Sequence, residues 1–272
     1  MQPKLPKVKG VIDGRILGVR IGAGTLTELV SAAQAAIAAR NGPFIFACAN
    51  PHSLVVAQRD AQFREALESA NAVVADGVGC KWGGALAGVS VGPRITGSDF
   101  FVSIMDQLNR TAGRAFFFGS SERVLTHLAE RVRVEFPRVH VRSLSPPYKP
   151  WEDAENRQMT EAIRAFNPDV LWVGMTAPKQ EKWVAANRMQ LNVPVIGSIG
   201  AVFDYYAGAT QRAPQWICNL GLEWLYRLPR EPKRLWRRTF VSAPVFLWIV
   251  LLERLRRQRP AVHLKGLRNG RQ

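Results

Sequence analysis

The sequence predicts an α/β fold with a mostly parallel sheet and helices on both of its faces. Short apolar runs typical of buried strands recur at residues 44–50, 73–75, 115–118, 139–142, 170–174 and 193–199. Segments with helix-starting residues or helical periodicity separate them. Such alternation is typical of βαβ units, whose right-handed crossovers bring the loops after the strands to one edge of the sheet. The predicted fold class is therefore Rossmann-like.

The elements follow in order from these signals. Residues 16–21 form a strand-like run, and Thr25-Leu-Thr-Glu28 predicts a capping box for a helix to about Arg40. One helix is expected from Pro51 to about Ser69, one from near Val78, one over 153–166 and one after Pro178. Gly22 and Gly24 form a G-x-G without a third glycine at the required spacing, which indicates a turn.

Composition limits the class of protein. The chain has 272 residues, 47% hydrophobic and 21% charged, which is enough for a sizeable core. Its three cysteines (Cys48, Cys80 and Cys218) have no C-x-x-C spacing, so neither a disulfide framework nor a zinc site is predicted. The N-terminus has basic residues without a following apolar stretch. We therefore expect no signal peptide and a protein that stays inside the cell.

Positive charge is concentrated late in the chain. The formal net charge is +16, and 13 Lys or Arg residues lie from Arg227 onward against two glutamates. Such a segment suits nucleic acid, an anionic membrane surface or a phosphorylated ligand, while a solvated basic tail is the simpler interpretation of the last ten residues. We divide the chain into a catalytic domain (1–220), an Arg-rich amphipathic appendage (221–260) and a basic tail (261–272).

The apolar run 240–252 has 13 residues, which is short of the roughly 20 that cross a bilayer. Basic flanks and Trp248 favour a segment that lies on an anionic membrane surface. A helix packed on the protein's own core is the alternative. Nucleic acid is not an expected partner, because no recognised binding motif is present.

An acid at a strand exit is the main candidate for chemistry. In Asn71-Ala-Val-Val-Ala-Asp76-Gly-Val-Gly79 an apolar run ends on Asp76 and two glycines. Ligands bind outside the carboxyl ends of parallel strands, where such an acid can take a proton from a substrate. Alternatively, Asp76 caps the helix that starts near Val78. Asn50 follows a strand in the same way, and an N-cap role with Pro51 at N1 does not exclude ligand contact.

Other loops at this edge offer groups for an anionic ligand. Arg94 lies in a Gly/Pro-flanked loop and is a candidate to grip phosphate or carboxylate, with a surface arginine as the alternative. Asp99 lies 20 residues beyond Gly79, as in a nicotinamide site, but Gly-Ser-Asp99 looks like the start of a helix, so we expect no dinucleotide cofactor and keep Asp99 as a substrate-binding candidate. Gly119 and Lys179-Gln180 are candidates for a nucleotide pyrophosphate cradle at helix N-termini, with an ordinary turn as the alternative. Asp204 follows a strand as Asp76 does, and Arg212 begins a stretch rich in aromatic residues and arginines.

The motifs that the sequence lacks limit the class of reaction that it can be expected to catalyse. The sequence has no D-x-D acid pair, no G-x-S-x-G elbow and no metal-ligand spacing among its four histidines, so no metal or cofactor is expected. If the later part is helical, Arg227, Arg234 and Arg237 share one face, with Pro232 at a helix start or kink. These features together suit transfer from an anionic nucleotide-linked donor to a lipid-held acceptor.

At this point the chain resembles the WecG/TagA/CpsF glycosyltransferases (glycosyltransferase family 26). The resemblance runs from Leu17 to about Arg238 in eight ordered blocks. The blocks are Ala47-Cys-Ala-Asn50, Ala75-Asp76-Gly-Val-Gly79, Arg94-Ile-Thr-Gly-Ser-Asp99, Phe117-Phe-Gly119, Pro178-Lys-Gln-Glu181, Phe203-Asp204-x-x-Ala-Gly208, Arg212-Ala-Pro-x-Trp216 and Gly221-Leu-Glu-Trp-Leu-Tyr-Arg227-Leu-x-x-Glu-Pro-x-Arg234.

The resemblance implies a sugar transfer from a UDP-sugar donor to an undecaprenyl-diphosphate-linked saccharide. It implies that Asp76 is the general base, that Asn50, Arg94, Gln180 and Asp204 line the pocket, and that Arg227, Arg234 and Arg237 belong to an appendage that closes over the site at the membrane. Where the family often has Thr, this chain has Cys48, a poorer hydrogen-bond donor, so specificity can differ.

We expect a single inverting displacement without a metal, in which Arg94, Arg212 and the appendage arginines meet the charge on the leaving UDP. UDP-N-acetylmannosamine, its uronic acid and UDP-glucose all remain candidate donors. The expected location is peripheral, on the inner face of the cell membrane, and a homo-oligomer is possible. The alternatives are a noncatalytic partner of a membrane polysaccharide complex and a basic nucleic-acid-binding protein.

Overall fold

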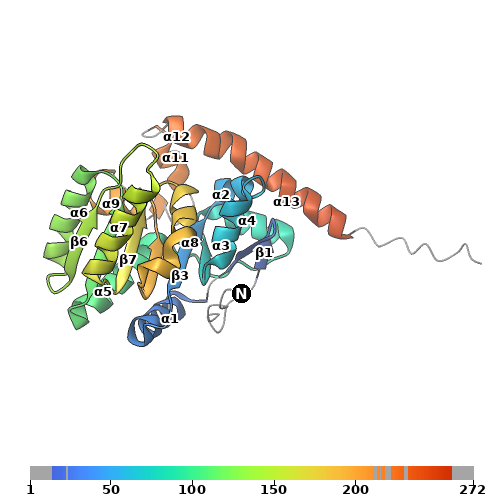
Figure 1. Ribbon diagram of the computed structural model, residues 1–272. Coiled ribbons are helices and arrows are strands. Elements are labelled where there is room, and N and C mark those ends of the chain that lie inside the picture. Colours follow the sequence, from blue (N-terminus) through green and yellow to red (C-terminus); the bar gives the residue numbers. More distant parts are fainter. Residues whose placement is uncertain are drawn as a thin grey trace, which may run out of the picture.

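The computed structural model describes residues 14–22, 24–210, 213–214, 216–217, 222–229 and 232–258, apart from the side chains of residues 233, 234, 237, 257 and 258. Its centre is a six-stranded sheet in which every neighbouring pair is parallel, in the order β4-β3-β8-β7-β5-β6 (Figure 1). The strands are β3 (Phe44–Ala49), β4 (Ala72–Ala75), β5 (Arg114–Gly119), β6 (His140–Leu144), β7 (Val170–Gly174) and β8 (Val195–Ser198). The predicted α/β class is confirmed.

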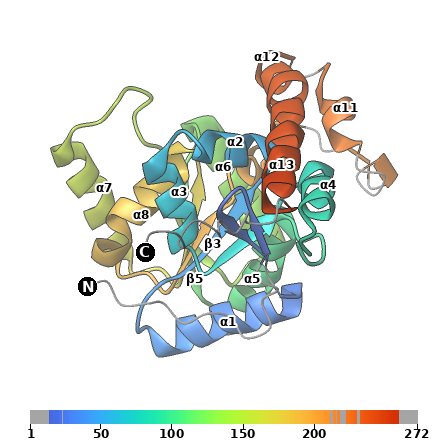
Figure 2. The same cartoon turned by 90° about the vertical axis from the view of Figure 1, so that its right-hand side faces the viewer.

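Helices cover both faces of the sheet because alternate strand residues point to opposite sides. In β3, Phe44 and Phe46 belong to one buried cluster, whereas Ile45 and Ala47 belong to the other. One cluster is completed by α1 (Leu26–Ala39), α5 (Gly97–Thr111), α6 (Glu122–Glu135) and α9 (Val202–Tyr206). The other is completed by α2 (Pro51–Ala57), α3 (Ala61–Ser69), α4 (Val78–Ala87), α7 (Asp153–Phe166), α8 (Lys179–Leu191) and α13 (Ala243–Gln258), as Figures 1 and 2 show.

The single strand expected at residues 16–21 is wrong. The structure has a hairpin there, with β1 (Gly14–Ile16) antiparallel to β2 (Val19–Ile21). The chain reverses at Leu17 and Gly18, whose φ angles are 50° and 78°. Two successive positive φ angles are typical of the tight turn that joins hairpin strands. An isolated bridge from Gly22 to Val73 joins the hairpin's end to β4.

The single helix expected from Pro51 to Ser69 is also wrong. It is divided into α2 and α3, because Asp60 is extended (φ −122°) and caps the second helix. Its Oδ1 accepts a hydrogen bond from the Phe63 N–H at 3.0 Å. A short acidic side chain that satisfies a helix's free N–H groups favours a new helix start over continuation. The capping box at Thr25 and Glu28 is confirmed.

The C-terminal part runs through α11 (Glu223–Arg227), α12 (Pro232–Trp236), a π-helix η1 (Arg237–Ser242) and α13. Pro232 begins α12, as expected. The shared face predicted for the arginines assumed one continuous α-helix. A turn at Leu228 and Pro229 separates α11 from α12, and the wider π turn changes the register after Trp236.

Helix α13 packs against α4 and α2. Phe246 and Val250 are buried on its inner side, and Trp248 is 61% exposed on its outer side. The run 240–252 is therefore amphipathic in place, with one side packed on protein. Gly83 permits this contact, because a Cβ there would lie 2.3 Å from Cζ of Phe246.

Gly83→Ala is predicted to loosen α13 from α4. Overpacking of this kind costs about 1–3 kcal/mol, so amide protection within residues 243–258 should fall about tenfold or more. Hydrogen exchange measured by mass spectrometry checks this, with Ala85→Ser, an exposed change on the same helix, as the control. Unchanged protection of α13 in a folded Gly83→Ala protein would contradict the packing argument.

Candidate active site

The candidate site lies where neighbouring strands send the chain to opposite faces of the sheet. β3 pairs with β8, but α2 follows β3 on one face and α9 follows β8 on the other. Such a divergence opens a crevice at the carboxyl edge of a parallel sheet, which is where these folds bind ligands. A cavity of about 690 Å³ occupies this position, bordered by the ends of β3, β4, β7 and β8.

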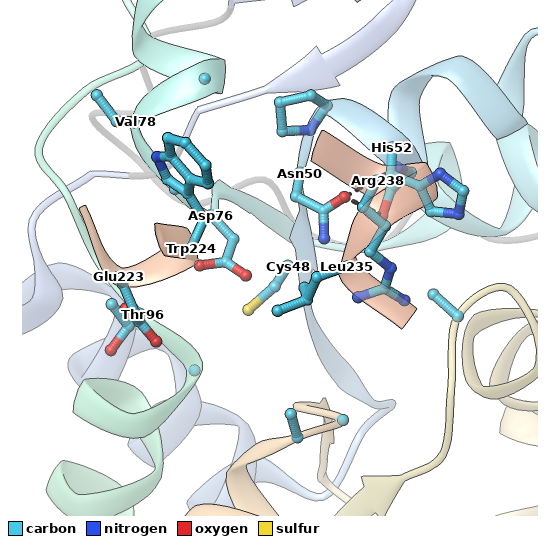
Figure 3. Close-up of a pocket in the computed structure, with 18 of the residues that line it drawn as sticks. Cys48, Asn50, His52, Asp76, Val78, Thr96, Glu223, Trp224, Leu235 and Arg238 are labelled. Atoms are coloured by element: carbon cyan, nitrogen blue, oxygen red, sulfur yellow. Dashed lines mark hydrogen bonds between the residues drawn. The ribbon is translucent and has the colours of Figure 1, made fainter. Parts of the chain in front are cut away.

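Asp76 follows β4 and lines this cavity, with Cys48 and Asn50 of the neighbouring β3 end beside it (Figure 3). Its backbone N–H donates to the Ala49 carbonyl at 2.8 Å, which extends the parallel pairing one residue past the strand. Gly77, with φ 86°, holds the N-cap position of α4. Asp76 is therefore not the N-cap residue, and its carboxylate is directed to the cavity.

Asn50 both caps a helix and lines the cavity. Its Oδ1 accepts hydrogen bonds from the Ser53 N–H at 3.0 Å and the Ser53 hydroxyl at 3.2 Å. The expected N-cap role with Pro51 in the first turn is confirmed. Because the cap uses the amide oxygen, the amide nitrogen is the group that Asn50 can offer a ligand.

Gln180 and Glu181 reach the cavity from the first turn of α8, after β7. The Gln180 Oε1 accepts from the Met175 N–H at 3.3 Å, and its Nε2 donates to Glu181 Oε1 at 2.8 Å. Glu181 is only 4% exposed, and this burial raises the pKa of its carboxyl to about 7. Its second oxygen, Oε2, is buried without a hydrogen-bond partner among the described atoms.

Cations line the same cavity. They are Lys81 on α4, Arg94 in the loop before α5, Arg227 on α11 and Arg238 on η1. Arg94 forms an ion pair with Glu223 of α11 at 3.7 Å, and the Arg227 guanidinium lies 5.1 Å from the centre of the Tyr205 ring. Through these two contacts, α11 is joined to the loop before α5 and to α9. The cavity can therefore offer a di-anionic ligand several charge-assisted hydrogen bonds.

One wall of the cavity is apolar and comes largely from the end of the chain. Leu235, Phe240, Phe246 and Leu247 line it together with Trp224. Trp82 of α4, the helix on which α13 packs, also lines the cavity and is 60% exposed. The cavity thus joins a polar floor at the strand ends to an apolar wall built by residues 224–247.

Six of the predicted site residues line the cavity, and they come from five separate segments of the chain. They are Cys48, Asn50, Asp76, Arg94, Gln180 and Arg227. Four other predicted residues do not line it, namely Asp99, Gly119, Lys179 and Asp204. Arg212 lies outside the described residues, and so do the side chains of Arg234 and Arg237.

The residues that do not line the cavity have local structural roles or lie elsewhere on the sheet. The Asp99 Oδ2 accepts from the Thr96 N–H at 2.9 Å in the capping box of α5. The Lys179 ammonium lies 3.9 Å from the centre of the Trp151 ring. Gly119 ends β5, which β7 separates from β8 and the crevice.

Several lining residues were not predicted individually. Glu181 lies in the same block as Gln180, so its position was visible in the sequence, but nothing there showed that its side chain would be buried. Arg238, Glu223 and Ser198 reach the cavity only through the fold. The resemblance implied an appendage that closes over the site, but no local sequence pattern placed residues 223–247 at the cavity.

The protonation of the Cys48 thiol and the positions of the possible metal ligands bear on the chemistry of the site. Burial, together with the nearby Asp76 and Glu181 carboxylates, raises the pKa of Cys48 well above its ordinary value. The thiol is therefore protonated and a poor nucleophile. Among the residues that the structure describes, no three His, Cys, Asp or Glu side chains come together in a way that could hold a metal ion.

A carboxylate that faces a cation-lined cavity at this point of a parallel sheet suits group transfer with an anionic substrate. The chain belongs to the WecG/TagA/CpsF family of glycosyl transferases, whose sequence model matches residues 14–260. The resemblance proposed from the sequence blocks is confirmed.

Relatives of known activity extend this comparison. A Bacillus spizizenii N-acetylglucosaminyldiphosphoundecaprenol N-acetyl-beta-D-mannosaminyltransferase is 30% identical over 226 residues, which cover 83% of this chain and 86% of that protein. A Bacillus subtilis protein of the same name is 29% identical, covering 77% and 79%. One from Staphylococcus aureus is 26% identical, covering 86% and 90%.

Glu181→Gln is predicted to flatten the pH dependence of stability. The ordinary pKa of 4.5 is raised to about 7 in the folded protein, so the native state holds this proton where the unfolded chain has lost it. Stability should therefore fall as the pH rises from about 4.5 to about 7, by on the order of 3 kcal/mol.

Urea unfolding of the wild type and Glu181→Gln between pH 4.5 and 8 measures this effect. The variant should gain relative stability as the pH rises. Glu161→Gln is the control, because Glu161 is exposed on α7 and should leave the curve unchanged. Parallel wild-type and Glu181→Gln curves would show that the carboxyl does not titrate in this window.

Proposed function

We propose that this protein is an inverting, metal-independent glycosyltransferase that moves a sugar from a UDP-sugar to an undecaprenyl-diphosphate-linked saccharide. The observation that carries the proposal is the position of Asp76. Its carboxylate faces a cavity of about 690 Å³ whose lining combines cations with an apolar wall. A nucleotide diphosphate needs the cations, and a lipid-linked acceptor needs an apolar approach.

The reaction is a single displacement at the anomeric carbon. The Asp76 carboxylate removes the proton from a hydroxyl of the acceptor sugar as that oxygen attacks the anomeric carbon of the donor. The new carbon–oxygen bond forms on the face opposite the departing group, so the configuration inverts. The bond from the anomeric carbon to the UDP oxygen breaks, and UDP leaves with the electron pair.

Charge on the departing diphosphate is met by side chains. Arg94, Arg227 and Arg238 line the cavity, and guanidinium groups bind phosphate oxygens through paired hydrogen bonds. The ion pair between Arg94 and Glu223 leaves Arg94 anchored to α11 when a phosphate binds. Preorganised cations of this kind stabilise the charge that develops in the transition state.

N-acetylmannosamine is the sugar we propose first, because the relatives from three species carry N-acetylmannosaminyltransferase in their names. Their names also give N-acetylglucosamine on undecaprenyl diphosphate as the acceptor. The uronic acid of N-acetylmannosamine and glucose are the other donors in the proposal. The setting would be synthesis of a cell-surface or extracellular polysaccharide.

UDP release is expected only when the correct UDP-sugar and an undecaprenyl- or shorter-chain-diphosphate N-acetylglucosamine are both present, in detergent with EDTA. Asp76→Asn should reduce turnover by about 10²–10⁴-fold without loss of the fold, because it removes the base. Asp106→Asn, a change on the exposed side of α5, is the control and should keep full turnover.

A folded and fully active Asp76→Asn protein would refute the base assignment. Loss of activity in EDTA would refute the metal-independent mechanism. No release from any donor, in a protein that still binds lipid vesicles, would favour a noncatalytic partner of a polysaccharide complex. Salt-sensitive oligonucleotide binding without UDP-sugar binding would favour a nucleic-acid-binding protein.

We also propose that the rim beside the apolar wall lies on the anionic inner face of the cell membrane. None of the described helices is long and apolar enough to cross a bilayer. Trp82, Trp236, Phe240, Trp248 and Leu255 are large apolar side chains exposed on this side of the molecule. The exposed Arg254 and Arg256 on α13 add attraction to acidic lipids. A second copy of the chain is the other possible cover for this rim.

Trp248→Glu combined with Leu255→Glu is predicted to reduce co-sedimentation with anionic vesicles about tenfold or more, since two buried apolar contacts with lipid are lost. The affinity for UDP should stay within about twofold, because neither residue lines the cavity. The matched control is Val134→Glu, an exposed apolar position on α6. Unchanged sedimentation of the double variant, or a dimer that it dissociates, would argue against the membrane contact.

A further inference from the structure

Glu181 has a buried carboxyl group that the packing of the domain does not explain. One of its oxygens accepts from Gln180 Nε2 at 2.8 Å, and the other is buried without a described hydrogen-bond partner. Leaving such an oxygen unpaired is costly, and unpaired buried groups in native proteins commonly belong to functional sites. Glu181 lines the cavity. A ligand in the cavity is therefore the natural source of the missing partner.

A second buried polar group lines the same cavity without a described partner. It is the hydroxyl of Ser198, the last residue of β8, which is 1% exposed. Glu181 belongs to the helix that follows β7, and β7 pairs with β8. The two unpaired groups therefore come from neighbouring strand ends, and they occupy the floor of the cavity rather than its apolar wall.

The position of Glu181 relative to the proposed base follows from their shared neighbour. The pKa of the Cys48 thiol is raised by both Asp76 and Glu181, so the thiol lies within electrostatic reach of both carboxylates. Glu181 and the proposed base Asp76 line the same cavity, in which the reacting sugar rings would bind.

We propose that Glu181, assisted by Ser198, is a specificity-determining contact that accepts a hydrogen bond from a hydroxyl or acetamido N–H group of a reacting sugar. This inference rests on the proposed glycosyl transfer. In its ionised form the Glu181 carboxyl repels a diphosphate, and a diphosphate has no hydrogen to donate, so the partner of the ionised group is a sugar hydroxyl or N–H. A site built to pair a substrate N–H or O–H discriminates strongly against analogues that lack it.

The hydrogen bonds of Gln180 support a role for Glu181 in direct recognition. The Gln180 amide oxygen and nitrogen are both engaged, by Met175 and by Glu181 Oε1. Glu181→Gln can keep the bond to Gln180 through its own amide oxygen. The amide nitrogen then replaces Oε2, so an acceptor becomes a donor with little change of shape.

The test measures kcat/KM for the UDP-sugar and for the lipid-linked acceptor, together with the Kd of UDP and of the UDP-sugar. Glu181→Gln and Ser198→Ala are compared with the wild type and with Glu135→Gln. Glu135 bonds to Arg131 and Tyr206 and does not line the cavity, so it is the matched control. Ser198→Ala removes a hydroxyl with no described bond and should not lower the unfolding midpoint.

We expect Glu181→Gln to lower kcat/KM about tenfold or more for one sugar substrate, with the Kd of UDP within about twofold of the wild type. Ser198→Ala should also lower kcat/KM for the same substrate. A loss of kcat/KM for the UDP-sugar assigns the contact to the transferred sugar. A loss of kcat/KM for the lipid-linked acceptor assigns it to the acceptor sugar. Either result supports the inference.

Unchanged kcat/KM for both the UDP-sugar and the lipid-linked acceptor, in folded Glu181→Gln and Ser198→Ala proteins, would overturn the inference. So would an equal loss of affinity for UDP itself, because it would assign the carboxyl to the nucleotide base. The ratio of the Kd values for UDP-sugar and UDP needs no turnover. An inactive wild type would therefore count against the proposed function alone, and an altered ratio in Glu181→Gln would still assign the contact to the donor sugar.

Discussion

The arrangement of this molecule depends on the pairing of β3 with β8. These two strands are hydrogen-bonded neighbours, but the chain leaves them toward opposite faces of the sheet. Neither of the helices that follow these strands, α2 and α9, covers the gap that results at their carboxyl ends. Backbone pairing also carries Asp76 to the same place, since its N–H bonds to the last residue of β3. The floor of the cavity is therefore as rigid as the sheet itself.

The cavity combines charges of both signs in a small volume. Arginines that suit a diphosphate and carboxylates that suit sugar hydroxyls line the same space. Burial moves the pKa of Glu181 to about 7, while Glu223 pairs with Arg94. On the proposed function, each acid would limit where a phosphate can lie, so the acids would help to orient the substrate that the cations attract.

Sequence reasoning was most successful where a short local pattern decides the structure. The buried strands at 44–50 and 170–174 have continuous apolar runs, and capping residues placed the starts of α1 and α2. The hairpin at residues 14–21 was missed, because Leu17 is a poor indicator of positive φ. The break at Asp60 was missed because a cap inside a helical pattern looks like an ordinary polar residue.

The candidate site shows the same difference between features that a local sequence pattern predicts and features that it misses. Strand-end positions correctly brought Asn50 and Asp76 to the cavity, and the family resemblance correctly added Cys48. The strand-end rule could not tell which strands border the crevice, so it also selected Gly119 on β5. Residues such as Arg238 depend on how a segment far along the chain folds back over α4. Long-range placement of this kind has no local signal.

The π-helix η1 links the cavity lining to α13, and its length has a consequence for evolution. Each residue of an α-helix turns the chain by about 100°. A π-helix turns the chain by a smaller angle per residue, so removing one residue from 237–242 and reverting to an α-helix would leave the direction of the later residues nearly unchanged. Phe246 would still face Gly83. The same deletion inside α13 would instead turn the rest of that helix by about 100°.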